Sequence, residues 1–159
     1  MPVAEQVRSF SDFYEVELAE QVRSATFILG SVDAAQDVVH DVFVEMFKKW
    51  DVGITDPRAY LRRSVVNRCR DVMRRNAVAL RHRRSLRRED VPAVDAPLYD
   101  ALASLPFKQR AAVVLRYYLG LTEAEIAAAL GCAVGSVGPW IRRGLDRLAV
   151  QLRLPPEEP

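Results

Sequence analysis

The sequence has few of the residues that build catalytic or metal sites. Its 159 residues include two cysteines and two histidines, and these four are scattered along the chain. Cys69 and Cys132 fit neither a zinc-binding nor a redox spacing, so we expect core or half-buried thiols in a reducing compartment. No glycine-rich phosphate loop, nucleophile–base pair or metal-ligand cluster is recognisable. We therefore expect no catalytic residue, no metal and no cofactor, and an enzyme is the least supported class of function.

Long apolar runs are also missing. The uncharged stretch 126–141 is too short, and too rich in glycine and proline, to span a bilayer. The N-terminal segment is acidic and lacks the apolar run of a signal peptide. These absences predict a cytoplasmic protein with no membrane insertion.

The charged residues, by contrast, are plentiful and unevenly distributed. The net charge is only +2, but residues 1–61 hold 11 acids and 5 bases, whereas residues 62–88 hold 11 arginines and one acid. The remaining residues hold 9 acids and 7 bases. A concentrated basic block indicates a polyanionic partner, and the acidic first segment indicates a partner with a basic surface.

Apolar residues recur at helical spacing, which predicts an all-α fold of two small domains. The first domain, 1–75, should hold helices over 11–29, from Ser31 or Asp33 to about Trp50, and from about Pro57 to Met73. Either Val16 or Glu17 belongs to the first helix's apolar face, and Phe47 to the second's. On the second helix four polar residues lie beside that face, and a solvated helix surface is the simplest interpretation of them. They are Asp37, His40, Asp41 and Glu45.

The third predicted helix carries most of the basic block in the first domain. Its arginines lie off the apolar stripe and close to Tyr60 and Asn67, as expected of a surface that binds phosphates. A solvated basic helix is the alternative. The arginines are Arg62, Arg63, Arg68, Arg70, Arg74 and Arg75.

A linker is predicted over 76–97, basic in its first part and extended at its two prolines. The second domain, 98–153, should begin with a short helix over 98–104. The next helix should start at Pro106 and bury Val113 to Leu115, Tyr117 and Tyr118. Residues 154–159 read as a frayed tail.

A helix-turn-helix is predicted over 122–148. Thr122 and Glu125 have the spacing of a capping box, and Gly131 provides the left-handed residue that ends a short helix. Apolar residues then recur at helical spacing from Val137 to Leu152, with Arg142, Arg143 and Arg147 off that stripe. This pattern is typical of a helix that enters the DNA major groove, although an ordinary helical hairpin is the alternative.

Four segments, in their order and spacing, resemble bacterial RNA polymerase sigma factors of the extracytoplasmic-function group. They are AQDVVHDVF at 35–43, AYLRRSVVN at 59–67 with Asp71 and Arg74-Arg75, the stretch from Leu102 through Leu115-Arg116-Tyr117, and 122–148. The amino-acid sequence of the second segment most resembles that of an actinobacterial branch of the group. The resemblance implies two all-helical domains and a linker that threads through polymerase.

The resemblance also implies partners. The RNA polymerase core would be bound through the coiled coil of its β′ subunit by Asp37, His40, Asp41 and Glu45. Asn67 and the loop 48–57 would capture an unstacked base of the promoter −10 element, and the second domain would read the −35 element. An anti-sigma factor is a further expected partner. The resemblance implies DNA contacts for Tyr60, Arg62, Arg63, Asn67, Arg70, Arg74, Arg75, Ser136, Trp140, Arg142, Arg143 and Arg147.

The sequence departs from the family at two places. Gln36 and His40 replace the usual Glu and Gln on the polymerase-binding segment. Gly138-Pro139-Trp140 replaces basic or small polar residues on the DNA-reading helix, which predicts weak or unusual −35 recognition. If that helix starts near Ser136, Pro139 lies harmlessly in its first turn. The alternatives are a stand-alone helix-turn-helix regulator and a degenerate sigma-like protein that reads DNA poorly.

Overall fold

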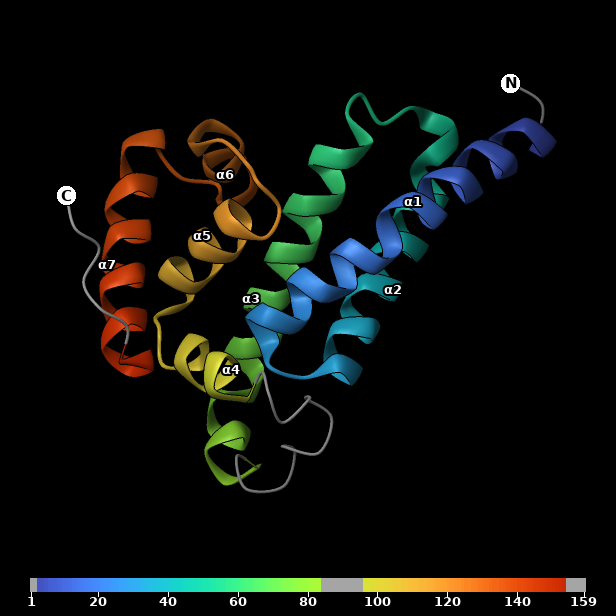
Figure 1. Cartoon of the computed structure of the whole chain (residues 1–159). Coiled ribbons are helices and arrows are strands. Elements are labelled where there is room, and N and C mark those ends of the chain that lie inside the picture. The colour runs from blue at the N-terminus through green and yellow to red at the C-terminus, as the bar shows by residue number, and fades with distance from the viewer. Residues whose placement is uncertain (1–2, 84–95, 154–159) are drawn as a thin grey trace.

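The computed structural model describes residues 3–83 and 96–153, and within these ranges the regular structure is helical (Figure 1). The predicted all-α fold is confirmed. The elements are α1 (Val3–Leu29), α2 (Val32–Lys49), the 3₁₀ turn η1 (Trp50–Val52), α3 (Pro57–Arg83), α4 (Ala96–Ala103), α5 (Phe107–Tyr117), α6 (Glu123–Leu130) and α7 (Val134–Leu152).

Helices α1, α2 and α3 pack around one core. The second helix begins as predicted, because the Ser31 hydroxyl accepts a hydrogen bond from the Ala34 N–H at 3.2 Å. The first helix starts earlier than predicted. Val16 is 70% exposed, whereas Glu17 is 2% exposed and accepts a hydrogen bond from Arg58 on α3. The inner face of α1 therefore includes a carboxylate, since a charged partner on α3 compensates its burial.

Two apolar residues assigned to the core lie at the surface instead. Phe47 at the end of α2 is 49% exposed, and Tyr117 at the end of α5 is 64% exposed. Both sit in the last turn of a helix, where the core no longer covers the apolar stripe. The prediction for Tyr118 holds in part, because this residue packs against the core while remaining half-buried.

Helices extend into both ends of the predicted linker. α3 continues to Arg83, and α4 begins at Ala96, two residues before the predicted start of that helix. Pro97 does not interrupt α4, because proline is tolerated in the first turn, where its missing N–H has no helical partner. The middle of the predicted linker and the predicted tail, 84–95 and 154–159, lie outside the described residues.

The helix-turn-helix forms as predicted. Thr122 and Glu125 make both hydrogen bonds of the capping box, at 3.2 and 2.8 Å, and Gly131 adopts a φ of +66°. One detail differs, because α7 begins at Val134 rather than near Ser136. Pro139 therefore lies in the second turn, where it removes a backbone hydrogen bond.

The two domains pack against each other (Figure 1). Phe27 of α1 stacks on Tyr99 of α4 and also contacts Tyr118, with ring centroids 5.3 and 5.2 Å apart. Arg110 of α5 is 6% exposed and donates a 2.7 Å hydrogen bond to the Ile28 carbonyl at the end of α1. One hydrophobic cluster thus runs from the first domain into the second.

None of the helices in the described part of the chain is both long and apolar enough to cross a membrane on its own. α6 and α7 meet such a criterion only as a pair, and the pair is bent by 98°.

Candidate nucleic-acid and polymerase interfaces

The arginines of α3 flank the buried face of this helix. Leu61, Val65, Val66 and Cys69 are at most 1% exposed, so the arginines between them emerge at the sides of the helix. Of the five α3 arginines predicted to contact DNA, three are exposed and two are half-buried. The exposed ones are Arg63, Arg74 and Arg75, and the half-buried ones are Arg62 and Arg70.

A cavity of about 230 Å³ lies between α2 and α3, beside the predicted base-binding residue Asn67. Tyr60 and Asn67, both predicted site residues, line it together. Val42 and Glu45 of α2 form the opposite wall. The structure therefore joins one residue of the predicted polymerase-binding set to two of the predicted DNA-binding set.

The rim of this cavity includes a lysine that the sequence had not singled out. The Lys49 ammonium donates to the Tyr60 hydroxyl at 3.3 Å and lies 6.0 Å from the centroid of that ring. These contacts hold a cation at the rim. Lys49 ends α2 and falls within the predicted base-binding loop 48–57, but its contact with Tyr60 depends on how α2 packs against α3, which the sequence alone does not report.

The loop beside the cavity is supported from α1. Trp50 packs edge-on against Phe10, with centroids 5.2 Å apart, and also contacts Phe13. Val52 is 87% exposed, and Gly53 has a φ of +85°, a conformation that favours glycine. The loop therefore starts from a fixed aromatic anchor and ends in an exposed apolar tip.

The predicted acidic face of α2 is present at the surface. Asp37, His40 and Asp41 are exposed, and Glu45 is half-buried. The hydrogen bond from Lys48 at 3.1 Å, together with its positive charge, lowers the pKa of Glu45. The sequence analysis missed the exposed apolar surface contributed to this helix by Val44 and Phe47, 41% and 49% exposed.

The predicted DNA-binding residues of α7 differ in accessibility. Arg142, Arg143 and Arg147 are exposed, whereas Ser136 and Trp140 are half-buried. The Lys108 ammonium of α5 lies 5.3 Å from the centroid of the Trp140 ring. Trp140 therefore faces α5 in part and is not fully available to a DNA groove.

Comparison with known proteins identifies the family. Family profiles for Sigma-70 region 2 and Sigma-70 region 4 match residues 14–79 and 95–148. The RNA polymerase sigma-E factor of Streptomyces avermitilis is 32% identical over 166 residues, covering 92% of this chain and 87% of that protein. The chain belongs to the RNA polymerase sigma factors of the extracytoplasmic-function group. The predicted resemblance is thereby confirmed.

Two further sigma factors support the actinobacterial branch. The RNA polymerase sigma-E factor of Streptomyces antibioticus is 35% identical and covers 92% of this chain and 86% of that protein. The ECF RNA polymerase sigma factor SigE of Mycolicibacterium smegmatis is 33% identical and covers 79% of this chain and 54% of that protein. As a sigma factor, the protein directs core polymerase to promoters and begins transcription there, and sigma factors are not enzymes.

Two solved structures share the fold. The Bartonella quintana sigma factor RpoE, solved with the anti-sigma factor NepR, has a TM-score of 0.76 at 21% identity and covers 94% of this chain and 99% of that one. CnrH, solved with the cytosolic domain of CnrY, has a TM-score of 0.73 at 26% identity and covers 92% and 88%.

The second domain of this sigma factor covers part of the α3 arginine surface. The Arg70 guanidinium donates to the Leu130 carbonyl of α6 at 3.3 Å and lies 5.3 Å from the Phe107 ring centroid. The Arg62 Nε is buried without a hydrogen-bond partner. The pKa of Glu125 on α6 is lowered mainly by the Thr122 backbone N–H, and the charge of Arg62 lowers it further. Two of the five predicted α3 arginines therefore face the second domain.

The described part of this sigma factor contains no candidate metal site. There, no group of three histidine, cysteine, aspartate or glutamate side chains lies close enough to hold an ion.

Proposed function

We propose that the two domains divide promoter recognition, with 1–75 binding core polymerase and the −10 element and 98–153 binding the −35 element. The segment 76–97 would act as the linker between these tasks. The protein would work by binding alone, without chemistry of its own, in the cytoplasm where polymerase and promoter DNA meet. The clustered arginines of α3 and the acidic face of α2 support this division of roles.

Core polymerase would bind α2. The exposed Asp37 and Asp41 offer negative charge to a basic surface, with His40 between them and Glu45 at their C-terminal end. The exposed side chains of Val44 and Phe47 add apolar area on the same helix. By the family resemblance, the partner would be the β′ subunit.

The −10 element would be opened at the cavity between α2 and α3, and this cavity is the observation that carries the proposal. Asn67 can both donate and accept hydrogen bonds, so its amide suits the edge of an unstacked base. Tyr60 offers a ring and a hydroxyl at the same cavity. Exposed Arg63, Arg74 and Arg75 would hold phosphates nearby, with Arg62 and Arg70 joining when the second domain moves away.

The −35 element would be held by α7 through Arg142, Arg143 and Arg147, with Ser136 and Trp140 at the margin. A second candidate function, a sigma-like protein with weak −35 reading, is favoured by one observation. Trp140 contacts Lys108 and is half-buried, so a groove contact would require it to change its surroundings.

An anti-sigma factor is a further proposed partner. The sigma factor RpoE of the same fold was solved with the anti-sigma factor NepR, and CnrH was solved with the cytosolic domain of CnrY. A stand-alone helix-turn-helix regulator would give the α2 surface no role, and co-purification with core polymerase separates that alternative from a sigma factor.

The decisive experiment is run-off transcription with reconstituted holoenzyme carrying Asn67→Ala. Loss of the base contact should lower open-complex formation about tenfold or more, since a base contact is worth about 1–3 kcal/mol. Asn76→Ala is the matched control, because Asn76 is exposed on the same helix and does not line the cavity. Equal transcription by the two variants would contradict base capture at Asn67.

A further inference from the structure

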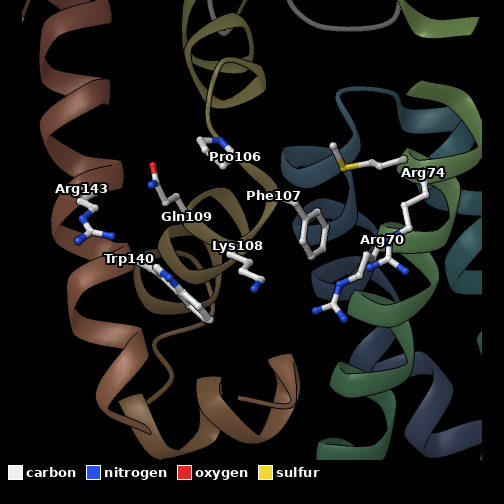
Figure 2. A pocket seen from close by; sticks show the side chains of 9 residues that line it. Arg70, Arg74, Pro106, Phe107, Lys108, Gln109, Trp140 and Arg143 are labelled. Carbon is white, nitrogen blue, oxygen red and sulfur yellow. The ribbon is translucent and has the colours of Figure 1, made fainter. Parts of the chain in front are cut away.

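A second cleft, of about 500 Å³, lies between the two domains (Figure 2). One wall comes from α3, with Arg70 and Arg74, and the other comes from α5 and α7, with Lys108 and Arg143. No acidic side chain is found among the described residues that line it. Four cations thus surround one cavity without a neutralising partner in its lining, which creates a site of strongly positive potential.

Two of these cations are held at the wall by aromatic rings. Arg70 lies 5.3 Å from the Phe107 centroid, and Lys108 lies 5.3 Å from the Trp140 centroid. A cation over a ring face is attracted by the negative face of that ring. Because both side chains are already placed, an anion that binds between them loses less free energy to side-chain ordering.

The N-terminus of α5 opens into the same cleft. Its N-cap, Pro106, makes no side-chain hydrogen bond to the first turn, and Phe107 to Gln109 of that turn line the cavity. The N–H groups of a first turn lack helical partners and favour negative charge.

Gln109 adds an unpaired polar group to the wall of the cleft. The residue is 8% exposed, lines the cleft, and has a buried Oε1 without a hydrogen-bond partner. A buried acceptor without a partner is costly, and this oxygen is closed to solvent, so a donor from a ligand would reach it after the Gln109 side chain turns toward the cleft.

We propose that this cleft binds a nucleoside polyphosphate, which bridges the two domains. Its phosphates are held by the four cations and the α5 N-terminus, and Gln109 Oε1 accepts from a ribose hydroxyl or a base amino group once this side chain turns toward the ligand. Met73, Phe107 and Trp140 provide apolar surface for the base.

The position of the cleft gives the ligand a regulatory effect. A ligand that contacts Arg74 of the first domain and Arg143 of the second stabilises the closed arrangement seen here. It also occupies Arg70 and Arg74, which we assign to promoter phosphates. The nucleotide and the promoter therefore compete for these arginines. A nucleotide unit within a DNA strand offers the same phosphate and base groups, so DNA is the other possible source of this ligand chemistry.

The test is isothermal titration of the full-length protein with ATP at constant ionic strength. Arg74→Ala and Arg143→Ala should each weaken binding about tenfold, as expected for loss of a charged hydrogen bond. The adjacent residues Arg75 and Arg142 provide matched controls, because they are exposed on the same helices but do not line the cleft. Arg75→Ala and Arg142→Ala should change ATP affinity by no more than about twofold.

Four results would overturn the proposal. Equal weakening by all four variants would mean diffuse attraction to a basic surface, and inorganic triphosphate binding as tightly as ATP would remove the nucleoside from the site. The third is a single-stranded DNA oligonucleotide whose binding depends on Arg74 and Arg143 while ATP does not compete. That result would assign the cleft to the DNA path. A loss confined to one domain's arginine would likewise contradict bridging.

Discussion

The two domains present their arginine-bearing helices in different ways. On α3 of the first domain, Arg62 and Arg70 face the second domain, so part of the basic surface is in use within the protein. On α7 of the second domain, Arg142, Arg143 and Arg147 are all exposed, but the helix depends on close contact with α5 behind it. The contact between domains thus covers part of the α3 surface, whereas the α7 arginines stay exposed and α7 is held in place by packing within its own domain.

The largest expected effect comes from removing the Arg110 side chain, because this residue forms hydrogen bonds both between the domains and within the second domain. Arg110 donates to the Ile28 carbonyl of the first domain and to the Ala103 and Leu105 carbonyls of its own. Arg110→Ala should lower the free energy of unfolding by about 3 kcal/mol, since buried acceptors lose a charged donor. Urea unfolding would measure it.

Arg116→Ala is the control for Arg110→Ala. Arg116 lies on the same helix, is exposed, and donates to the Leu121 carbonyl. Its loss should cost less than about 1 kcal/mol. Equal costs for the two variants would mean that Arg110 does not join the domains.

The next effect isolates the packing behind α7. A Cβ at Gly144 would lie 2.8 Å from Val113 Cγ2 and 3.4 Å from the Gln109 carbonyl oxygen. Gly144→Ala should therefore destabilise the protein by about 1–3 kcal/mol in thermal or urea unfolding, because the close contact of α5 and α7 is lost. Gly135→Ala on the same helix meets nothing within 4 Å, and should be neutral or stabilise by up to about 1 kcal/mol. A destabilising Gly135→Ala would argue against this packing explanation.

A smaller effect tests the helix that precedes α7. Thr122→Ala removes the cap of α6 and should cost about 1 kcal/mol in urea unfolding at neutral pH. Thr55→Ala, in an exposed loop, is the control.

The pH dependence of this cap has a defined sign. The Thr122 backbone N–H lowers the pKa of Glu125 in the folded protein. A lowered carboxyl pKa stabilises the fold above the unfolded value of about 4.3, and this contribution is lost as pH falls through the folded value. Because alanine at position 122 keeps this backbone N–H, the matched variant is Glu125→Gln, which removes the charge instead. The stability difference between wild type and Glu125→Gln should shrink in acid, and a difference that grows there would contradict the capping box.

The smallest expected effect is a difference in chemical labelling between the two cysteines, one in each domain, measured without any substitution. Burial raises the pKa of Cys69 in the first domain to about 12, so its thiol stays protonated and inaccessible at neutral pH. Cys132 in the second domain is half-buried. Iodoacetamide should label Cys132 in the native protein and both cysteines in denaturant, with mass spectrometry as the measurement. Native labelling of Cys69 would indicate that the first domain opens readily.

Local signals predicted the helices well. Ser31, the Thr122–Glu125 pair and Gly131 act on the backbone within three or four residues, so their effects follow from sequence alone. The predicted start of α7 was wrong because the N-cap residue, Ala133, has no side chain that could form a capping hydrogen bond and so indicate the start of the helix. The residue roles at the polymerase and DNA surfaces stay predictions.

Contacts between distant segments could not be predicted. The burial of Glu17 depends on Arg58, 41 residues later, and neither residue indicates the other in a single sequence. In the same way, Arg70 and Arg74 were assigned to one task and Trp140 and Arg143 to another. Their meeting at one cleft depends on how the domains dock, which periodicity does not report.

The hydrogen bond from Arg70 to the Leu130 carbonyl makes one guanidinium serve two competing equilibria. In the role proposed for Arg70, promoter DNA reaches this group only when the second domain moves away from α3, so the apparent affinity for DNA would be reduced by the fraction of molecules that remain closed. By reciprocity, whatever loosens the α3–α6 contact raises that affinity by the same factor by which DNA favours opening. Domain opening and DNA binding would then be coupled equilibria. The strength of the contact at Leu130, far along the chain from Arg70, would set the promoter concentration at which the protein binds.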